Sequence, residues 1–313
     1  MSYTKDKDNA ESNIAKIERS RLLRNVTYAS VFVAIFLVCL KFVAWSITDS
    51  VSILSSLVDS VFDSLASIFN LLAVRHALIP ADKDHRFGHG KAEALSGLAQ
   101  STFIFGSIIF LIIEVIRRFF SPKIIDNSSV GIIIIVISLL VTIVLVVYQR
   151  EIIRRTNSKA IKADSLHYLS DLLLNGGVIM SLILTSYAGI VLIDPIVALL
   201  ISIYVLYISY GIFISSIDEL MDREFTEKDR QKIIKIVLNH RFVENIHDLR
   251  TRKSGFKSFI QFHLDLPANI SLLKAHKISD EVEEVLLYNF PESEIIIHQD
   301  PAGIDEQKDC FEV

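Results

Sequence analysis

GIIIIVISLLVTIVLVVY, residues 131–148, has no polar face when it is read as a helix. A soluble helix needs a polar face toward water, whereas a run of about 20 apolar residues fits the roughly 30 Å hydrocarbon core of a bilayer. The rest of the chain agrees, because 51% of its residues are hydrophobic and its mean hydropathy is +0.45. The sequence therefore predicts a membrane protein.

Five further apolar segments accompany this one, which predicts six transmembrane helices. They cover about residues 25–47, 51–78, 94–120, 131–148, 160–187 and 190–217. Lysine and arginine gather before the first span and in the loops after the second and fourth, and such loops stay in the cytoplasm. We therefore expect both termini to be cytoplasmic. We also expect an N-terminal arm over residues 1–20, without a cleavable signal peptide, and a transmembrane domain over residues 21–220.

From about residue 221 the composition becomes that of a soluble domain. TEKDRQKIIKIVLNH, which starts at Thr226, predicts an amphipathic helix with this threonine as N-cap. Two alternating stretches meet at Ser254 and Gly255, which predicts a hairpin. A second helical pattern and the strand EIIIHQD follow. The order αββαβ predicts a small α+β domain over residues 221–302, with a tail over residues 303–313.

Two pairs of metal-ligand residues lie inside the predicted spans. Asp59 and Asp63 are four residues apart in the second span, and His167 and Asp171 have the same spacing in the fifth. Residues at i and i+4 share one face of a helix. An ionised side chain at the bilayer centre costs at least about 2.5–3.5 kcal/mol, so these groups need one another, a water-filled cavity or a cation.

The two pairs together offer three oxygens and one nitrogen, a set of ligands that suits tetrahedral Zn2+. Mg2+ and Ca2+ prefer oxygen alone, while Fe2+, Co2+ and Cd2+ come next to Zn2+. The competing interpretation is that the aspartates only hydrogen-bond neighbouring helices, which two matched pairs disfavour. Because metal binds deprotonated ligands, the same site, His167 and Asp63 above all, predicts exchange of metal for protons. Lys41, in the first span, is expected to extend toward the membrane surface.

Several other function classes lack their signatures. The net charge is −4 and no basic stripe is present, so the sequence predicts no nucleic-acid partner. The two cysteines form no CxxC motif, and no HExxH motif indicates an intramembrane metalloprotease, so we expect no enzyme. A channel is disfavoured because tight coordination slows release of the ion. A membrane metal sensor remains an alternative, although it needs no aspartates in the bilayer.

Five stretches carry a resemblance to a known family: LVDSVFDS, PADKDHRFGHGKAEALSGLAQS, EIIRRTNSKAIKADSLHYLSD, HDLRTRKSG and IIIHQDP. They resemble the bacterial zinc and ferrous-iron efflux pumps of the cation diffusion facilitator family, from about residue 20 to residue 301. The resemblance implies a homodimer in the inner membrane and a metallochaperone-like cytoplasmic domain. It assigns the transport site to Asp59, Asp63, His167 and Asp171, and it favours Zn2+ and Cd2+ over Mn2+. Exporters selective for Fe2+ or Mn2+ remain the alternatives.

A second metal site is expected in the loop between the second and third spans. Asp82, His85 and His89 lie there, and His-x3-His with a nearby aspartate can hold a metal by three ligands. The alternative is a solvated loop with incidental histidines. The resemblance also pairs Lys91, in this loop, with Asp222 as a charge interlock, although an exposed pair is worth only about 0–1 kcal/mol.

The soluble domain contains the remaining candidate ligands, which are His247, His263, His276, His298 and Asp300. The spacing of His298 and Asp300 places both on one face of a strand. In the resembling proteins these five residues form a binuclear zinc site at the dimer interface, in which the aspartate bridges the two ions. The alternative is a set of scattered surface histidines.

Overall fold

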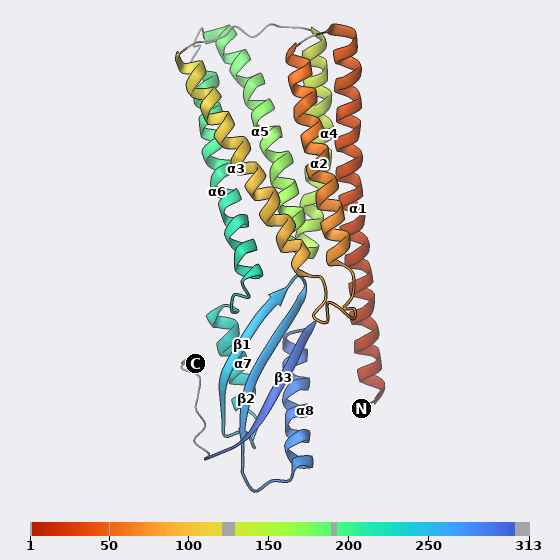
Figure 1. Ribbon diagram of the computed structural model, residues 1–313, viewed down its shortest axis with the longest axis vertical. Coiled ribbons are helices and arrows are strands. Elements are labelled where there is room, and N and C mark those ends of the chain that lie inside the picture. The colour runs from red at the N-terminus through yellow and green to blue at the C-terminus, as the bar shows by residue number, and fades with distance from the viewer. Residues whose placement is uncertain (1, 50, 121–128, 189–192, 304–313) are drawn as a thin grey trace. The chain divides into compact units, whose positions relative to one another are not determined.

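A computed structural model describes residues 2–49, 51–120, 129–188 and 193–303 (Figure 1). Its first six helices are α1 (Ser2–Thr48), α2 (Val51–Ala77), α3 (Lys91–Phe120), α4 (Ser129–Thr156), α5 (Lys159–Ala188) and α6 (Ile193–Leu220). All six predicted spans correspond to these helices. The expected start of the sixth span at residue 190 and the tail over residues 304–313 lie outside the described residues.

Contacts divide the chain into two units: Met1–Asp82 with Ala92–Ile217, and Lys83–Lys91 with Asp218–Val313. The boundary near residue 220 agrees with the change in composition. The loop Lys83–Lys91 groups with the second unit, whereas the sequence placed it in the membrane domain. Residues expected to form a separate N-terminal arm continue α1, which begins at Ser2.

Two residues explain why α4 ends and α5 begins where they do. Asn157 has φ of 53°, the left-handed conformation that asparagine tolerates and that commonly ends a helix. The next residue, Ser158, accepts a hydrogen bond at its Oγ from the backbone N–H of Ile161 at 3.3 Å, which caps the start of α5. The turn is therefore short and fixes α5 directly after α4.

Among the apolar clusters of the helical unit, two include residues of α5. Leu145 and Val146 of α4 pack against Tyr168 of α5, while Leu166 of α5 packs against Val205 of α6 in a cluster that also includes α3. Packing on two sides buries most of residues 160–170, in the first half of α5. The packing of α5 against α3, α4 and α6 therefore fixes the position of the residues that it presents to α2.

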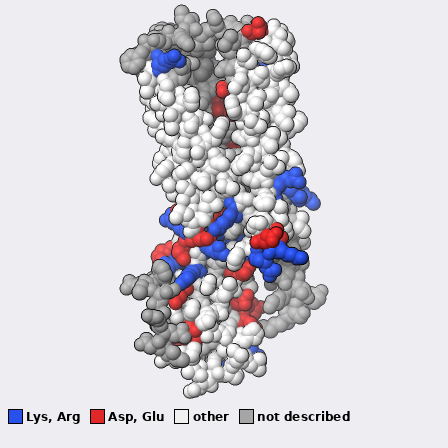
Figure 2. Space-filling model, viewed as in Figure 1, with Lys and Arg blue, Asp and Glu red and all other residues white. Residues whose placement is uncertain are grey.

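The outer surface of these helices is apolar. Phe32 of α1, Phe110 of α3 and Tyr207 of α6 are each more than 70% exposed, and a soluble bundle would not leave such side chains in water. Figure 2 shows little charge over the middle of the apolar helices on the face in view, apart from a few acidic atoms between them, while other charged atoms lie toward the helix ends. Within the described residues, α1, α2, α3, α4 and α6 are long and apolar enough to cross a membrane. The polar first half of α5 distinguishes it from these five helices.

The second unit has the predicted element order, which is α7 (Glu227–Leu238), β1 (Asn245–Ser254), β2 (Lys257–Leu266), α8 (Leu272–Asn289) and β3 (Ser293–Pro301). Thr226 caps α7, as predicted, by accepting from the N–H of Asp229. β1 and β2 are antiparallel around a turn in which Gly255 has φ of 61°, and β3 pairs parallel to β2. The sheet order is β1-β2-β3.

Both helices of this unit cover the same face of the sheet (Figure 1). Ile260, Phe262 and Leu264 of β2 alternate along the strand and are buried in the core together with Ile233 of α7 and Val282 of α8. Gln261 and His263, which alternate with them, must therefore point to the opposite face. That second face is where the candidate ligands of the strands are found.

Candidate metal centres

The paired residues of α2 and α5 meet inside the helical unit. Nε2 of His167 lies 3.0 Å from Oδ1 of Asp63 and 3.7 Å from Oδ2 of Asp171. The His167 side chain is 10% exposed, while those of Asp63 and Asp171 are 24% and 38% exposed. The cluster is thus largely enclosed but remains reachable from outside the protein.

The size of this cluster suits a transition-metal ion. One donor atom from each of Asp63, His167 and Asp171 lies within 4.8 Å of the other two. Three points so close together all lie within about 2.8 Å of a common centre, and zinc bonds to oxygen and nitrogen are about 2.0–2.2 Å long. Shifts of less than about 1 Å would therefore bring all three donors to bonding distance.

Asp59, the fourth predicted ligand, is exposed and is not part of this group of three. It lies one helical turn before Asp63 on the same side of α2. The structure consequently brings together three of the four predicted residues. A rotation of the Asp59 side chain or a shift of α2 is needed to add the fourth.

Lys41 does not extend to the membrane surface, so that prediction was wrong. Its Nζ donates to Oγ of Ser60 at 2.6 Å and to the carbonyl oxygen of Ser56 at 3.2 Å. Both acceptors belong to α2. The side chain therefore turns inward because two neighbouring oxygens satisfy its ammonium group.

A buried carboxylate that the sequence analysis missed lies one turn before His167. Asp164 is 1% exposed, and its two oxygens accept from Nε2 of Gln149 at 2.8 Å and Nε2 of Gln100 at 3.4 Å. The same Gln149 nitrogen lies 3.0 Å from Oγ of Ser30 and donates to it. This network ties α5 to α1, α3 and α4. A signal was available, because Asp164 is another acidic residue within a predicted span.

In the second unit, the register of the sheet lines up three histidines. His247 of β1 is opposite His263 of β2, which is opposite His298 of β3. The ring centroids are 5.0 Å apart in the first pair and 4.5 Å apart in the second. On the next rung, Asp265 lies beside Asp300. Residues from three separate strands thus form one row on the face that the helices leave uncovered.

Asp300 is the centre of this row. Its Oδ2 lies 2.7 Å from Nδ1 of His263 and 3.6 Å from Nε2 of His247, and its Oδ1 lies 3.1 Å from Nε2 of His298. Each carboxylate oxygen therefore faces a different set of histidines, which is the arrangement that a bridging ligand needs. Asp265 was not predicted, yet its Oδ1 lies 3.2 Å from Nδ1 of His247.

His276 lies apart from this cluster. It belongs to α8, its side chain is 65% exposed, and its Nε2 is 3.5 Å from Oδ2 of Asp280 in the next turn. None of the metal-ligand groups formed by the described residues includes it. Four of the five predicted ligands of this domain are therefore gathered within one chain.

The loop after α2 holds its predicted ligands close together. The rings of His85 and His89 have centroids 4.5 Å apart, and Asp82 offers a third donor atom within 4.8 Å. His89 is buried while the other two are exposed. The loop can hold an ion with three ligands and leave a position for water.

The predicted pair of Lys91 and Asp222 is present in the second unit. Nζ of Lys91 lies 3.0 Å from Oδ1 of Asp222 and donates at 3.3 Å to the carbonyl oxygen of Leu220. Arg252 reaches the same carboxylate at 3.4 Å. These side chains are between 30% and 40% exposed, so the ion pair holds Lys91 beside Asp222 but adds little stability to the fold.

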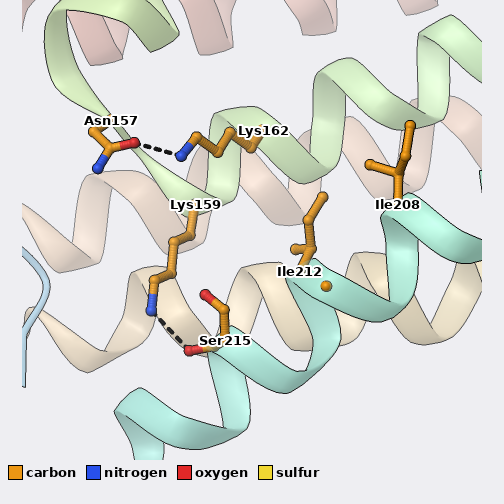
Figure 3. Close-up of a pocket in the computed structure, with 7 residues that line it drawn as sticks. Asn157, Lys159, Lys162, Ile208, Ile212 and Ser215 are labelled. Atoms are coloured by element: carbon orange, nitrogen blue, oxygen red, sulfur yellow. Dashed lines mark hydrogen bonds between the residues drawn. The ribbon is translucent and has the colours of Figure 1, made fainter. Parts of the chain in front are cut away.

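A cavity of about 360 Å³ lies at the start of α5 and contains none of these ligands (Figure 3). Lys159 and Lys162 line it together with Ile208 and Ile212 of α6. Lys159 donates at 2.7 Å to the carbonyl oxygen of Ser215, and Lys162 donates to Oδ1 of Asn157. Its basic lining is unsuitable for a cation, so the three clusters above remain the candidate metal centres.

Comparisons with known proteins match almost the whole chain. Residues 27–221 match the family model for the cation efflux transmembrane domain, and residues 225–302 match that for the cytoplasmic domain of cation efflux proteins. The cation-efflux pump FieF of Serratia proteamaculans is 42% identical over 285 residues, which are 91% of this chain and 95% of that protein. Protein p34 of Rickettsia prowazekii is 46% identical over 286 residues, which are 91% and 95% of the two chains.

A solved structure matches part of the chain. It is the zinc form of CzrB, with 29% identity, 28% of this chain and 99% of that chain covered, and a TM-score of 0.26.

Proposed function

Because this chain belongs to the cation efflux family of multi-pass membrane transporters, we propose that it exports a divalent transition metal, Zn2+ by preference, in exchange for protons. The observation that supports this proposal most directly is the convergence of Asp63, His167 and Asp171 inside the helical unit. Acidic residues in a membrane interior are costly unless a cation or protons neutralise them. A transported metal ion supplies that neutralisation.

The donor set supports the preference for zinc. Two carboxylates and an imidazole, with Asp59 as the fourth ligand after a local shift, give the mixed oxygen and nitrogen shell that tetrahedral Zn2+ accepts. Fe2+ and Cd2+ are further substrates because their ligand preferences overlap with those of Zn2+. The nitrogen of His167 disfavours Mn2+, which prefers oxygen ligands.

Proton exchange follows from the same residues. His167 and Asp63 are 3.0 Å apart, and a proton shared between them must leave before both can bind one ion. Protons loaded from the outside are thus displaced by metal from the cytoplasm. Rocking of the helices between inward- and outward-open states then carries the cargo across, with Asp59 joining the site in one of these states.

In this proposal the histidine row of the second unit binds metal at the interface of a dimer. The protein acts as a homodimer in the bacterial inner membrane, with both termini in the cytoplasm, and the row binds two zinc ions bridged by Asp300. The exposed His276 completes the site of the partner subunit, which explains why it lies outside the cluster in its own chain. The ion pair of Lys91 and Asp222 then acts as a hinge for the loop after α2. Asp82, His85 and His89 bind a further ion.

Flux through proteoliposomes tests the transport proposal. Purified protein is reconstituted with a zinc indicator inside the vesicles, and Zn2+, Cd2+, Fe2+ and Mn2+ are added separately, each with and without an imposed pH gradient. We expect saturable flux that is largest for Zn2+ and that rises with the gradient. Flux that does not change with the pH gradient would exclude antiport, and metal binding without any flux would indicate a membrane metal sensor instead.

A further inference from the structure

The inward turn of Lys41 brings a positive charge to the transport site. Its two acceptors, Ser56 and Ser60, lie on α2 at positions that share one helical face with Asp59 and Asp63. The Lys41 ammonium also interacts electrostatically with Asp59, Asp63 and Asp171. One cation thus acts on all three carboxylates of the proposed site.

Neutral oxygens fix this ammonium in place. It donates to a serine hydroxyl at 2.6 Å and a carbonyl oxygen at 3.2 Å, and among the described residues it makes no direct ion pair with the three carboxylates. The charge therefore acts on the carboxylates through space and not through a direct ion pair. Because the ammonium is bonded elsewhere, it does not occupy the position of the metal.

The number of charges then matches the valence of the cargo. The three carboxylates carry three negative charges, Lys41 carries one positive charge, and His167 is neutral when it binds metal. Counted over the four ligand residues and Lys41, the site without metal has a net charge of two negatives, which a divalent ion cancels. In a bilayer any residual charge is penalised, so a complex with a divalent ion is favoured over one with a monovalent or trivalent ion.

We propose that Lys41 is a fixed counter-charge that selects divalent cations and keeps their binding weak enough for release. This inference rests on the proposed function, because it takes the three aspartates as the transport site. It gives the first helix a part in specificity, whereas the ligands themselves come from α2 and α5.

Replacement of Lys41 by glutamine tests the charge, and replacement by arginine retains it. Without the ammonium, the site carries one more negative charge, and the attraction of a divalent ion should increase. We expect Lys41→Gln to lower the KM for Zn2+ at least about tenfold and to lower kcat, because release becomes slower. Lys41→Arg should stay within about threefold of the natural protein in both constants.

A second variant should act in the opposite direction. Ser60→Ala removes the 2.6 Å acceptor but leaves the ammonium, which can then move toward Asp63 and compete with metal. We expect its KM to rise. Lys162→Gln is the matched control, because Lys162 bonds to Asn157 at the start of α5, and its KM should not change. A residue that only ties α1 to α2 would make Lys41→Gln and Ser60→Ala shift KM in the same direction.

A trivalent probe tests the selection by valence directly. Tb3+ is added to proteoliposomes during Zn2+ flux, and we expect it to inhibit Lys41→Gln much more strongly than the natural protein. Unchanged KM and unchanged Tb3+ inhibition in folded Lys41→Gln would overturn the proposal. If that variant does not fold, an unchanged KM in Ser60→Ala would overturn it equally. Normal flux in Asp63→Asn would instead refute the transport site and leave the position of Lys41 unexplained.

Discussion

Replacement of Asp63 by asparagine is the most direct test of the metal site in the helical unit. The change keeps the size of the side chain and removes one negative charge 3.0 Å from Nε2 of His167. At about 2.8 Å from a divalent ion, a unit charge contributes up to about 12 kcal/mol of attraction at an effective dielectric of 20. Most of this attraction is offset because the ion and the carboxylate both lose water.

The net loss is smaller but still large. Removing one partner of a buried charge pair costs about 3–5 kcal/mol, which corresponds to about 150-fold to several thousand-fold in affinity. We therefore expect the KM for Zn2+ in Asp63→Asn to rise at least 100-fold, or flux to disappear. The histidine row of the second unit has its own ligands and should bind zinc as before.

The assay is Zn2+ flux into proteoliposomes over a wide range of concentration, with zinc content measured on the purified protein. Asp49→Asn is the matched control, because Asp49 is exposed after α1 and has φ of 48°, a conformation that asparagine adopts readily. The control should transport normally. A KM in Asp63→Asn within threefold of that control would refute the coordination of the ion by α2.

Three further outcomes are expected. His167→Asp replaces the nitrogen donor with oxygen and should raise the ratio of Mn2+ to Zn2+ flux several-fold; an unchanged ratio would mean that the imidazole does not select the ion. Asp300→Asn should abolish zinc binding by the histidine row of the second unit while Zn2+ flux persists at saturating metal, and titration calorimetry would show the missing sites. Gly90→Ala would place a Cβ 2.2 Å from the carbonyl oxygen of Ser254. We therefore expect the stability of the second unit to fall by about 1–3 kcal/mol, which faster proteolysis of the loop Lys83–Lys91 would reveal.

The helices and strands could be predicted because their signals are local. Each apolar run of about 20 residues identifies a span without reference to the others, and Thr226 identifies the start of α7 by its own capping bond. The i,i+4 spacing likewise places His167 and Asp171 on one face of α5, whatever α5 packs against. These features needed only the chemistry of neighbouring residues.

Packing between elements decided the composition of the sites. Asp63 meets His167 while Asp59 does not, because the contact depends on how α2 lies against α5. In the sheet, register places Asp265 beside Asp300 and brings His247 opposite His263, although the two histidines are far apart along the chain. Spacing within one strand contains no information on that alignment.

The direction in which a polar side chain points inside a span likewise depends on the tertiary structure and not on the local sequence. The sequence alone established that Lys41 lies in a span, and that Asp164 does, but a lysine in a helix can point to lipid, to the surface or to a neighbour. Only the tertiary structure supplied Ser60 for Lys41 and two glutamines for Asp164. In a bilayer, a polar group lies where its partner is, and partners come from helices that are distant in the sequence.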